Sequence, residues 1–160
     1  MNIFYLHRIP HFAARMHCDK HVVKMCTETA QILATVHHLH GNHNVTYRAT
    51  HAGHPCVKWA AASPLHYRWL QRLGMALCAE YSFRYGPRRH KCEQYISGEL
   101  RDFPSAMANL KFHWSEPPAC MPDEFKKDSV VESYHEYYRK AKRAFAKWTH
   151  RIEPSFMLVA

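Results

Sequence analysis

Long apolar runs are missing from this sequence, and so are the short motifs of several enzyme classes. No stretch approaches the roughly 18 to 20 apolar residues of a membrane-spanning helix, and residues 1–6 lack the cationic start of a signal peptide. A G-x-S-x-G elbow, a phosphate-binding glycine loop and a dinucleotide-binding fingerprint are also absent. These absences disfavour serine hydrolases and nucleotide-cofactor enzymes. We expect a soluble cytoplasmic protein that needs no cofactor and has no membrane partner.

Glycine is scarce, with five residues in 160, and the apolar spacing is helical nearly throughout. This pattern predicts an all-α fold in which a single domain, residues 1–160, contains three long helices and several short ones. Long helices are expected over about 19–38, 64–85 and 129–147, and short ones near residue 10, over 55–59 and within 88–101. Asp19 is expected to cap the first long helix. Four prolines predict an irregular connection over 103–122.

The cysteines and histidines show little of the spacing that metal sites require. Six cysteines occur without a C-x-x-C pair, several at helical positions suited to small apolar side chains, which is typical of a reducing cytosol. His17 and His21 have the i, i+4 spacing of a helical zinc pair. However, Glu28 lies roughly 10 Å further along the axis, so a third ligand would have to come from elsewhere, such as His54. We expect no metal site.

Basic residues outnumber acidic ones by 22 to 13, and the formal net charge is +9. This charge favours anionic partners, with nucleic acid first. Residues 134–148 interleave cations with aromatic rings, which are the side chains that neutralise phosphates and stack on bases. The alternative is a core helix whose rings pack inward. The nucleic-acid contacts expected here are Tyr137, Tyr138, Lys140, Arg143, Lys147 and Trp148.

Two carboxylates lie on helices where their neighbours give them different expected roles. A helix through residues 17–36 places His21, Lys24 and Glu28 on one face, opposite an apolar stripe. A carboxylate beside cations indicates a candidate active site, although a solvated polar face is the commoner explanation for one amphipathic helix. Glu80 falls on an apolar face with Arg84 four residues on. We therefore expect a structural ion pair there rather than catalysis.

Residues 19–28 carry an Asp-x-His-[aliphatic]-[aliphatic]-x-x-x-x-Glu pattern that begins at Asp19 and ends at Glu28. This pattern resembles the pyrimidine-dimer DNA glycosylases of the phage endonuclease V family, small helical enzymes that excise a damaged base and nick the abasic strand. Weaker echoes are Gly53-His54 before a long helix and the aromatic, basic C-terminal segment. The chain also looks like a group of phage proteins that begin Met-Asn-Ile-Phe-Tyr-Leu, which implies the host cytoplasm.

The resemblance implies an endonuclease V-like fold with Glu28 as the catalytic acid. It also implies that the N-terminal α-amine attacks the sugar C1′ and forms a Schiff base. Because Asn2 is large, we expect Met1 to be retained and to supply this amine. Thr27 and Gln31 stand where the family has DNA-contacting arginines. The remaining expected site residues are Asn2, His21 and Lys24 beside the acid, and Arg15, Lys20 and His54 on the DNA.

Three hypotheses follow from these residues. The leading one is a DNA glycosylase, with abasic-site lyase activity, that acts on damaged or modified pyrimidines in duplex DNA and needs no protein partner. The second is an enzyme that uses the same fold on a modified phage base or a free nucleotide. The third is a nucleic-acid-binding protein without catalysis, for which binding would weaken steeply with salt.

Overall fold

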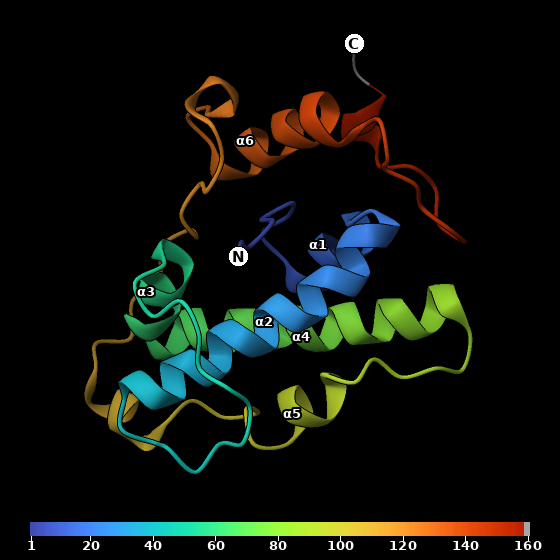
Figure 1. Ribbon diagram of the computed structural model, residues 1–160. Helices are drawn as coiled ribbons and strands as arrows, with labels where there is room; N and C mark the ends of the chain where they lie inside the picture. Colours follow the sequence, from blue (N-terminus) through green and yellow to red (C-terminus); the bar gives the residue numbers. More distant parts are fainter. Residues whose placement is uncertain (159–160) are drawn as a thin grey trace.

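The computed structural model describes residues 1–158, and every regular element in that range is helical. The two long helices, α2 (Asp19–Leu39) and α4 (Pro64–Tyr85), cross at the centre of the molecule (Figure 1). The short helices α1 (Pro10–Met16), α3 (Pro55–Ala61) and α5 (Glu93–Ser97) pack around them. The all-α prediction is confirmed, and both long helices begin and end within one residue of the expected positions.

The ends of the helices follow from the local sequence. The Ser63 hydroxyl accepts a hydrogen bond from the Leu65 N–H at 3.2 Å, and Pro64 occupies the first turn of α4. Gly86, with φ of +80°, ends that helix. The expected cap of α2 is wrong, because Cys18 precedes the helix and Asp19 lies in its first turn. The Asp19 carboxylate instead accepts the Thr149 N–H at 3.0 Å.

Helices α2, α4 and α5 approach one another closely at Gly74 of α4, next to the part of α2 that carries Glu28. A Cβ atom on Gly74 would lie 2.8 Å from the Thr29 methyl group and 3.1 Å from Ile96. Only glycine fits this contact without displacing its neighbours. The N-terminal segment, residues 3–6, is buried in the same core. The first residues of the chain are therefore held against α2.

The prediction of a third long helix over 129–147 is wrong, because the α-helix there is much shorter. Helix α6 covers Val130–Tyr137 and is capped by Ser129, and a π-helical turn follows over Tyr138–Lys142. The closely spaced cations Arg139, Lys140 and Lys142 within this turn, and Arg143 directly after it, repel one another along a helix. Hydrogen bonds to the start of α2 also draw the chain away, since the Lys147 carbonyl accepts the Asp19 N–H at 2.8 Å. Three short 3-10 helices complete the described structure, at Ser105–Asn109, Asp123–Phe125 and Ser155–Met157.

Glu80 and Arg84 form the expected ion pair inside the core. The Arg84 Nε lies 2.8 Å from Glu80 Oε1, and Arg84 Nη1 reaches Asp19 at 2.9 Å. Arg151 also donates two hydrogen bonds to Glu80, at 2.8 and 2.9 Å. Burial alone would raise the pKa of Glu80, but the bonds from Arg151 and Arg84 outweigh it and lower the pKa. This network joins α4 to α2 and to the C-terminal segment.

Within residues 1–158, no helix combines the length and the apolar character needed to cross a membrane.

Candidate active site

Glu28 lies against the N-terminus of the chain. Its Oε1 atom is 3.8 Å from the Met1 amine, and its Oε2 atom accepts the Asn2 N–H at 2.8 Å. The residue is 7% exposed, and the Met1 side chain is 2% exposed. In this partly desolvated setting, opposite charges interact more strongly than on an open surface. The carboxylate is thus largely out of water, and the amine lies beside it near the surface, on a residue that is half-buried as a whole.

The Asn2 side chain fixes this end of the chain. Its Nδ2 donates to the Cys120 carbonyl at 2.9 Å, and its Oδ1 accepts from the Tyr134 hydroxyl at 2.7 Å. The Ile3 N–H also donates to Oδ1, at 2.8 Å. A chain terminus is usually mobile unless it is tied down in this way. The role of Asn2 as an anchor to residues far along the chain was not visible in the sequence.

Lys24 stands at the mouth of the site. Its Nζ is 3.3 Å from Glu28 Oε1, and its side chain is 65% exposed. On this face of α2 both His21 and Glu28 are buried, and so is His17, which ends α1 just before the helix. The solvated-face explanation for this helix is therefore wrong, and Lys24 is its exposed exception.

His21 supports the N-terminal segment from beneath. Its ring stacks on Phe4 with centroids 4.3 Å apart, and its Nδ1 lies 2.5 Å from the Tyr138 hydroxyl. Burial, followed by the nearby charges of His17 and Lys142, lowers the pKa of His21 to about 3. A neutral ring at physiological pH cannot donate a proton as an imidazolium does. These contacts favour a positioning role for His21, through Phe4.

We expect the two buried histidines to make stability depend on pH. Burial lowers the pKa of His17 to about 4, from an ordinary value of 6.5. The folded state binds these protons less readily than the unfolded state. The contribution of the two histidines to the free energy of unfolding is therefore fully present above pH 6.5 and is lost as the pH falls below it. For each histidine, the free energy of unfolding should fall by up to about 1.4 kcal/mol for each pH unit of acidification.

Urea unfolding between pH 7 and pH 5 measures this slope. His17→Leu should reduce it by the contribution of one histidine, whereas His11→Gln, at an exposed position, should leave it unchanged. The buried His17 Nε2 has no hydrogen-bond partner, so leucine removes no contact there, although the Nδ1 bond to the Ala13 carbonyl is lost. An unchanged slope in His17→Leu would contradict the expectation.

The expected aromatic platform near the C-terminus is partly wrong. Tyr138 is completely buried against His21, because the π-helical turn directs it into the core, so its ring cannot stack on a base in this arrangement. Trp148 is half-buried and donates to the Met16 carbonyl at 3.0 Å. Tyr137 is also half-buried, with Lys142 Nζ 4.3 Å above its ring centroid.

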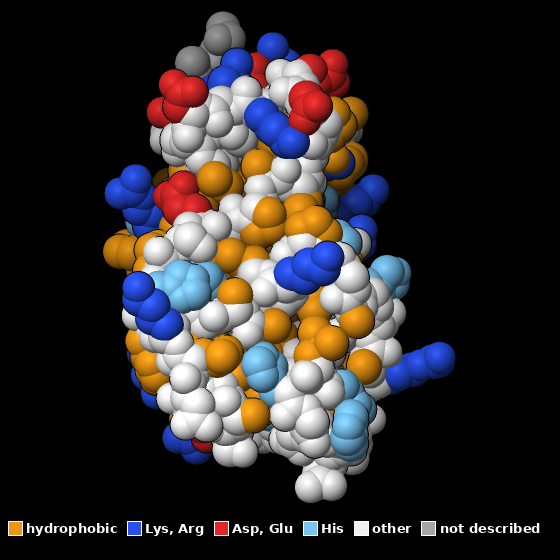
Figure 2. All heavy atoms as spheres, turned by 90° about the vertical axis from the view of Figure 1, so that its left-hand side faces the viewer, with side chains coloured by type: hydrophobic (Ala, Val, Ile, Leu, Met, Phe, Trp, Pro, Cys, Tyr) orange, Lys and Arg blue, Asp and Glu red, His pale blue; other side chains and the backbone are white. Residues whose placement is uncertain are grey.

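The cations of the same segment remain at the surface. Lys140, Arg143 and Lys147 are exposed. Lys140 pairs with Glu136 at 2.8 Å, which offsets part of its charge. Lys20 is exposed above the Phe145 ring, at 5.0 Å from its centroid. On the face shown in Figure 2, Lys and Arg side chains are scattered among hydrophobic and histidine side chains rather than gathered into one patch.

Arg15 and His54 lie in different surroundings. Arg15 lines a groove of about 470 Å³ between α1 and residues 150–154. His54 caps α3, where its Nδ1 accepts the Cys56 N–H at 3.1 Å. Burial and then the charge of the N-terminus lower the pKa of His54. The charged N-terminal amine therefore acts on His54.

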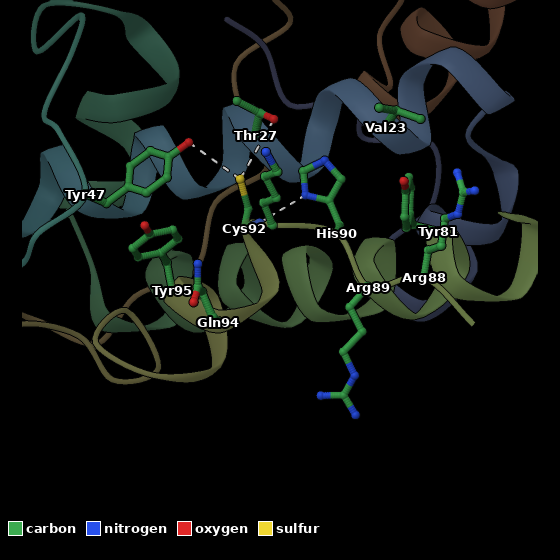
Figure 3. Close-up of a pocket in the computed structure, with 11 residues that line it drawn as sticks. Val23, Thr27, Tyr47, Tyr81, Arg88, Arg89, His90, Cys92, Gln94 and Tyr95 are labelled. Atoms are coloured by element: carbon green, nitrogen blue, oxygen red, sulfur yellow. Dashed lines mark hydrogen bonds between the residues drawn. The ribbon is translucent and has the colours of Figure 1, made fainter. Parts of the chain in front are cut away.

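A cavity of about 830 Å³ opens on another face of α2 (Figure 3). Val23 and Thr27 line it from α2, and Thr27 lies roughly 100° around the helix from Glu28. Three tyrosines and the basic run at residues 88–91 complete much of the lining. The basic run follows Gly86-Pro87, a signal that was present in the sequence and was overlooked. In Figure 3 the Arg89 side chain points away from the cavity.

The fold and the site define a helical protein in which the first residues of the chain and a glutamate on the first long helix form one polar centre. The family model described as pyrimidine dimer DNA glycosylase matches residues 1–94, more than half of the 160 residues. The chain belongs to this family, and family membership implies DNA as the substrate. Neither the curated proteins nor the solved structures contain a match.

Proposed function

We propose that this protein is a DNA glycosylase with abasic-site lyase activity, in which the N-terminal amine is the nucleophile and Glu28 handles the proton. The observation that carries the proposal is the 3.8 Å separation between the half-buried Met1 amine and Oε1 of the buried Glu28. In the first step, the amine nitrogen bonds to the sugar C1′ while the glycosidic bond breaks and the base leaves with the bonding electrons. The amine proton passes to Glu28, the C1′–O4′ bond then breaks as O4′ takes up that proton, and the opened sugar stays joined to the amine as a Schiff base.

Glu28 can assist both the attack by the amine and the departure of the base. As a carboxylate it can accept the proton that the attacking amine loses, and it can stabilise positive charge that develops on the sugar. The arrangement also tolerates removal of Met1, since the Asn2 nitrogen that would become the amine already lies 2.8 Å from Glu28 Oε2. Lys24, exposed beside Glu28, is suited to a DNA phosphate.

Duplex binding is proposed to extend from Lys24 toward the cavity of Figure 3. The family's arginines are replaced here by Thr27 and Gln31. However, Arg88 and Lys91 line the same cavity as Thr27. Arg15, Lys20, Lys140, Arg143 and Lys147 are exposed and available for further phosphate contacts. These cations support DNA binding, with an affinity that should fall steeply as salt rises.

The test uses duplex DNA that contains one cyclobutane pyrimidine dimer, with undamaged duplex as the control. The protein should cleave the strand at the dimer and, in the presence of borohydride, form a covalent adduct with it. An enzyme that excised the base without forming an adduct would contradict the lyase part of the proposal. Absence of both products, on a dimer and on a preformed abasic site, would contradict the whole.

A second candidate function is favoured by the cavity itself. Its combination of tyrosine rings with basic side chains also suits a free nucleotide, which would stack on the rings and pair its phosphate with the cations. In that case a nucleoside monophosphate should raise the thermal unfolding temperature. Duplex binding at physiological salt should then be absent.

A further inference from the structure

Three metal-ligating side chains from distant parts of the chain meet beside the N-terminus. His54 and Cys56 come from the start of α3, and Cys120 comes from the segment that leads toward α6. Their ligand atoms all lie within 4.8 Å of one another. Within the described residues this is the one such group of three or more His, Cys, Asp or Glu side chains. We propose that His54, Cys56 and Cys120 bind a zinc-class divalent cation.

The sulfur atoms already have the spacing that such an ion requires. Cys56 Sγ and Cys120 Sγ are 3.6 Å apart. In a tetrahedral site with Zn–S distances of about 2.3 Å, two sulfur ligands lie about 3.8 Å from each other. The thiols therefore need only a small shift, with loss of their protons, to accept the ion. Two thiolates and one imidazole are a donor set that favours zinc over magnesium or calcium.

The histidine must change its partner when the ion binds. At present its Nδ1 accepts the Cys56 N–H at 3.1 Å, which caps α3. Coordination through Nδ1 replaces that hydrogen bond, and coordination through Nε2 requires the proton to move to Nδ1. In either case α3 loses one capping bond and gains a link through the ion. His54 is half-buried, so its ring is not fixed by packing on every side.

Three protein ligands leave one coordination position open. Sites of this kind hold water or an external ligand in the fourth position, in contrast to closed structural sites with four protein ligands. The Cys120 carbonyl accepts the Asn2 side chain at 2.9 Å, so the cluster lies one hydrogen bond from the N-terminal residues. In Figure 1 the N-terminus lies near α3 and near the segment leading to α6. A bound ion would fix Cys120 to α3 and so stabilise the backbone that anchors Asn2.

The cation site is independent of the glycosylase reaction and can be tested without DNA. The untagged full chain, kept reduced, is titrated with Co²⁺ as a spectroscopic substitute for Zn²⁺. We expect an intense thiolate-to-cobalt charge-transfer band that saturates at one ion per chain and is displaced by Zn²⁺. Zinc should also raise the thermal unfolding temperature relative to protein held in chelator.

Two variants remove one ligand each while sparing the fold. Cys120→Ala changes a partly exposed thiol, and His54→Asn keeps an N-cap acceptor at the start of α3. Each should lower cobalt affinity by at least about a hundredfold. This is more than the loss of affinity expected when a residue that only hydrogen-bonds to a metal ligand is removed. The matched control is Cys78→Ala, which removes a thiol from the Cys26–Cys78 pair, 3.8 Å apart and outside the cluster.

Circular dichroism in chelator shows that each variant is folded before it is titrated. The proposal is overturned if the reduced wild-type chain gives no charge-transfer band. It is also overturned if the band keeps its strength in both ligand variants, or if Cys78→Ala abolishes it while they do not. Retention of the band in the control, with its loss in both ligand variants, supports the site.

Discussion

Glu28→Gln should lower the rate of base excision by about a thousandfold. Glutamine has the same shape and can still accept the Asn2 N–H, which lies 2.8 Å from Oε2 in the wild type. However, it carries no charge, cannot take the proton from the attacking amine, and cannot stabilise a cationic sugar. Single-turnover excision of a dimer from duplex DNA measures the effect without interference from product release.

The control for this variant is Glu124→Gln, which makes the same chemical change at an exposed position. It should excise the dimer at the wild-type rate. DNA affinity of Glu28→Gln should be unchanged or raised, because the substitution removes a negative charge near the phosphates. If Glu28→Gln and Glu124→Gln were equally active, Glu28 would have no role in the chemistry. A binding protein without catalysis would show no excision in any of the three proteins.

Displacing the N-terminal amine should abolish the borohydride adduct and the strand cleavage that depends on it. The Met1 side chain is 2% exposed, and its nitrogen is 3.8 Å from Glu28. A short extension before Met1 converts that amine to an amide, which is no nucleophile, and moves the new terminus away. We expect adduct formation to fall by about a thousandfold or more, the range assigned to a lost covalent catalyst.

A protease-cleavable extension supplies the matched control. Cleavage that regenerates the authentic terminus should restore the adduct, and intact mass shows whether Met1 or Asn2 carries the amine. Full adduct formation by the extended protein would refute the amine mechanism and direct attention to Lys24, the nearest exposed amine to Glu28. Excision without adduct in the extended protein would assign a water nucleophile to the first step.

Much of the architecture was predictable because its signals are local. Proline and serine at the start of α4 and glycine after its end set the limits of that helix. Glu28 is predicted as the catalytic residue, a role still to be tested, because helical periodicity and a short pattern fall on the same residue. These signals depend on residues a few positions apart, where the backbone geometry fixes which side chains share a face.

The largest failures involve contacts between distant residues. Tyr138 was expected to face nucleic acid, but it is buried against His21, which lies 117 positions earlier. The last helix stops early because its final segment binds the start of α2. The pairing of Cys56 with Cys120 spans 64 positions, so neither cysteine showed the spacing of a site. Periodicity along one segment carries no information about which segment will cover it.

The anchoring of Asn2 also determines when the active centre can form during synthesis of the chain. Residue 2 is made first, but its side chain is held by the carbonyl of residue 120 and the hydroxyl of residue 134. The matched part of the chain, residues 1–94, contains neither partner. A nascent chain on the ribosome would thus carry its N-terminal amine, the proposed nucleophile, long before it could orient it. Premature termination products should be inactive toward DNA, whatever helices they have already formed.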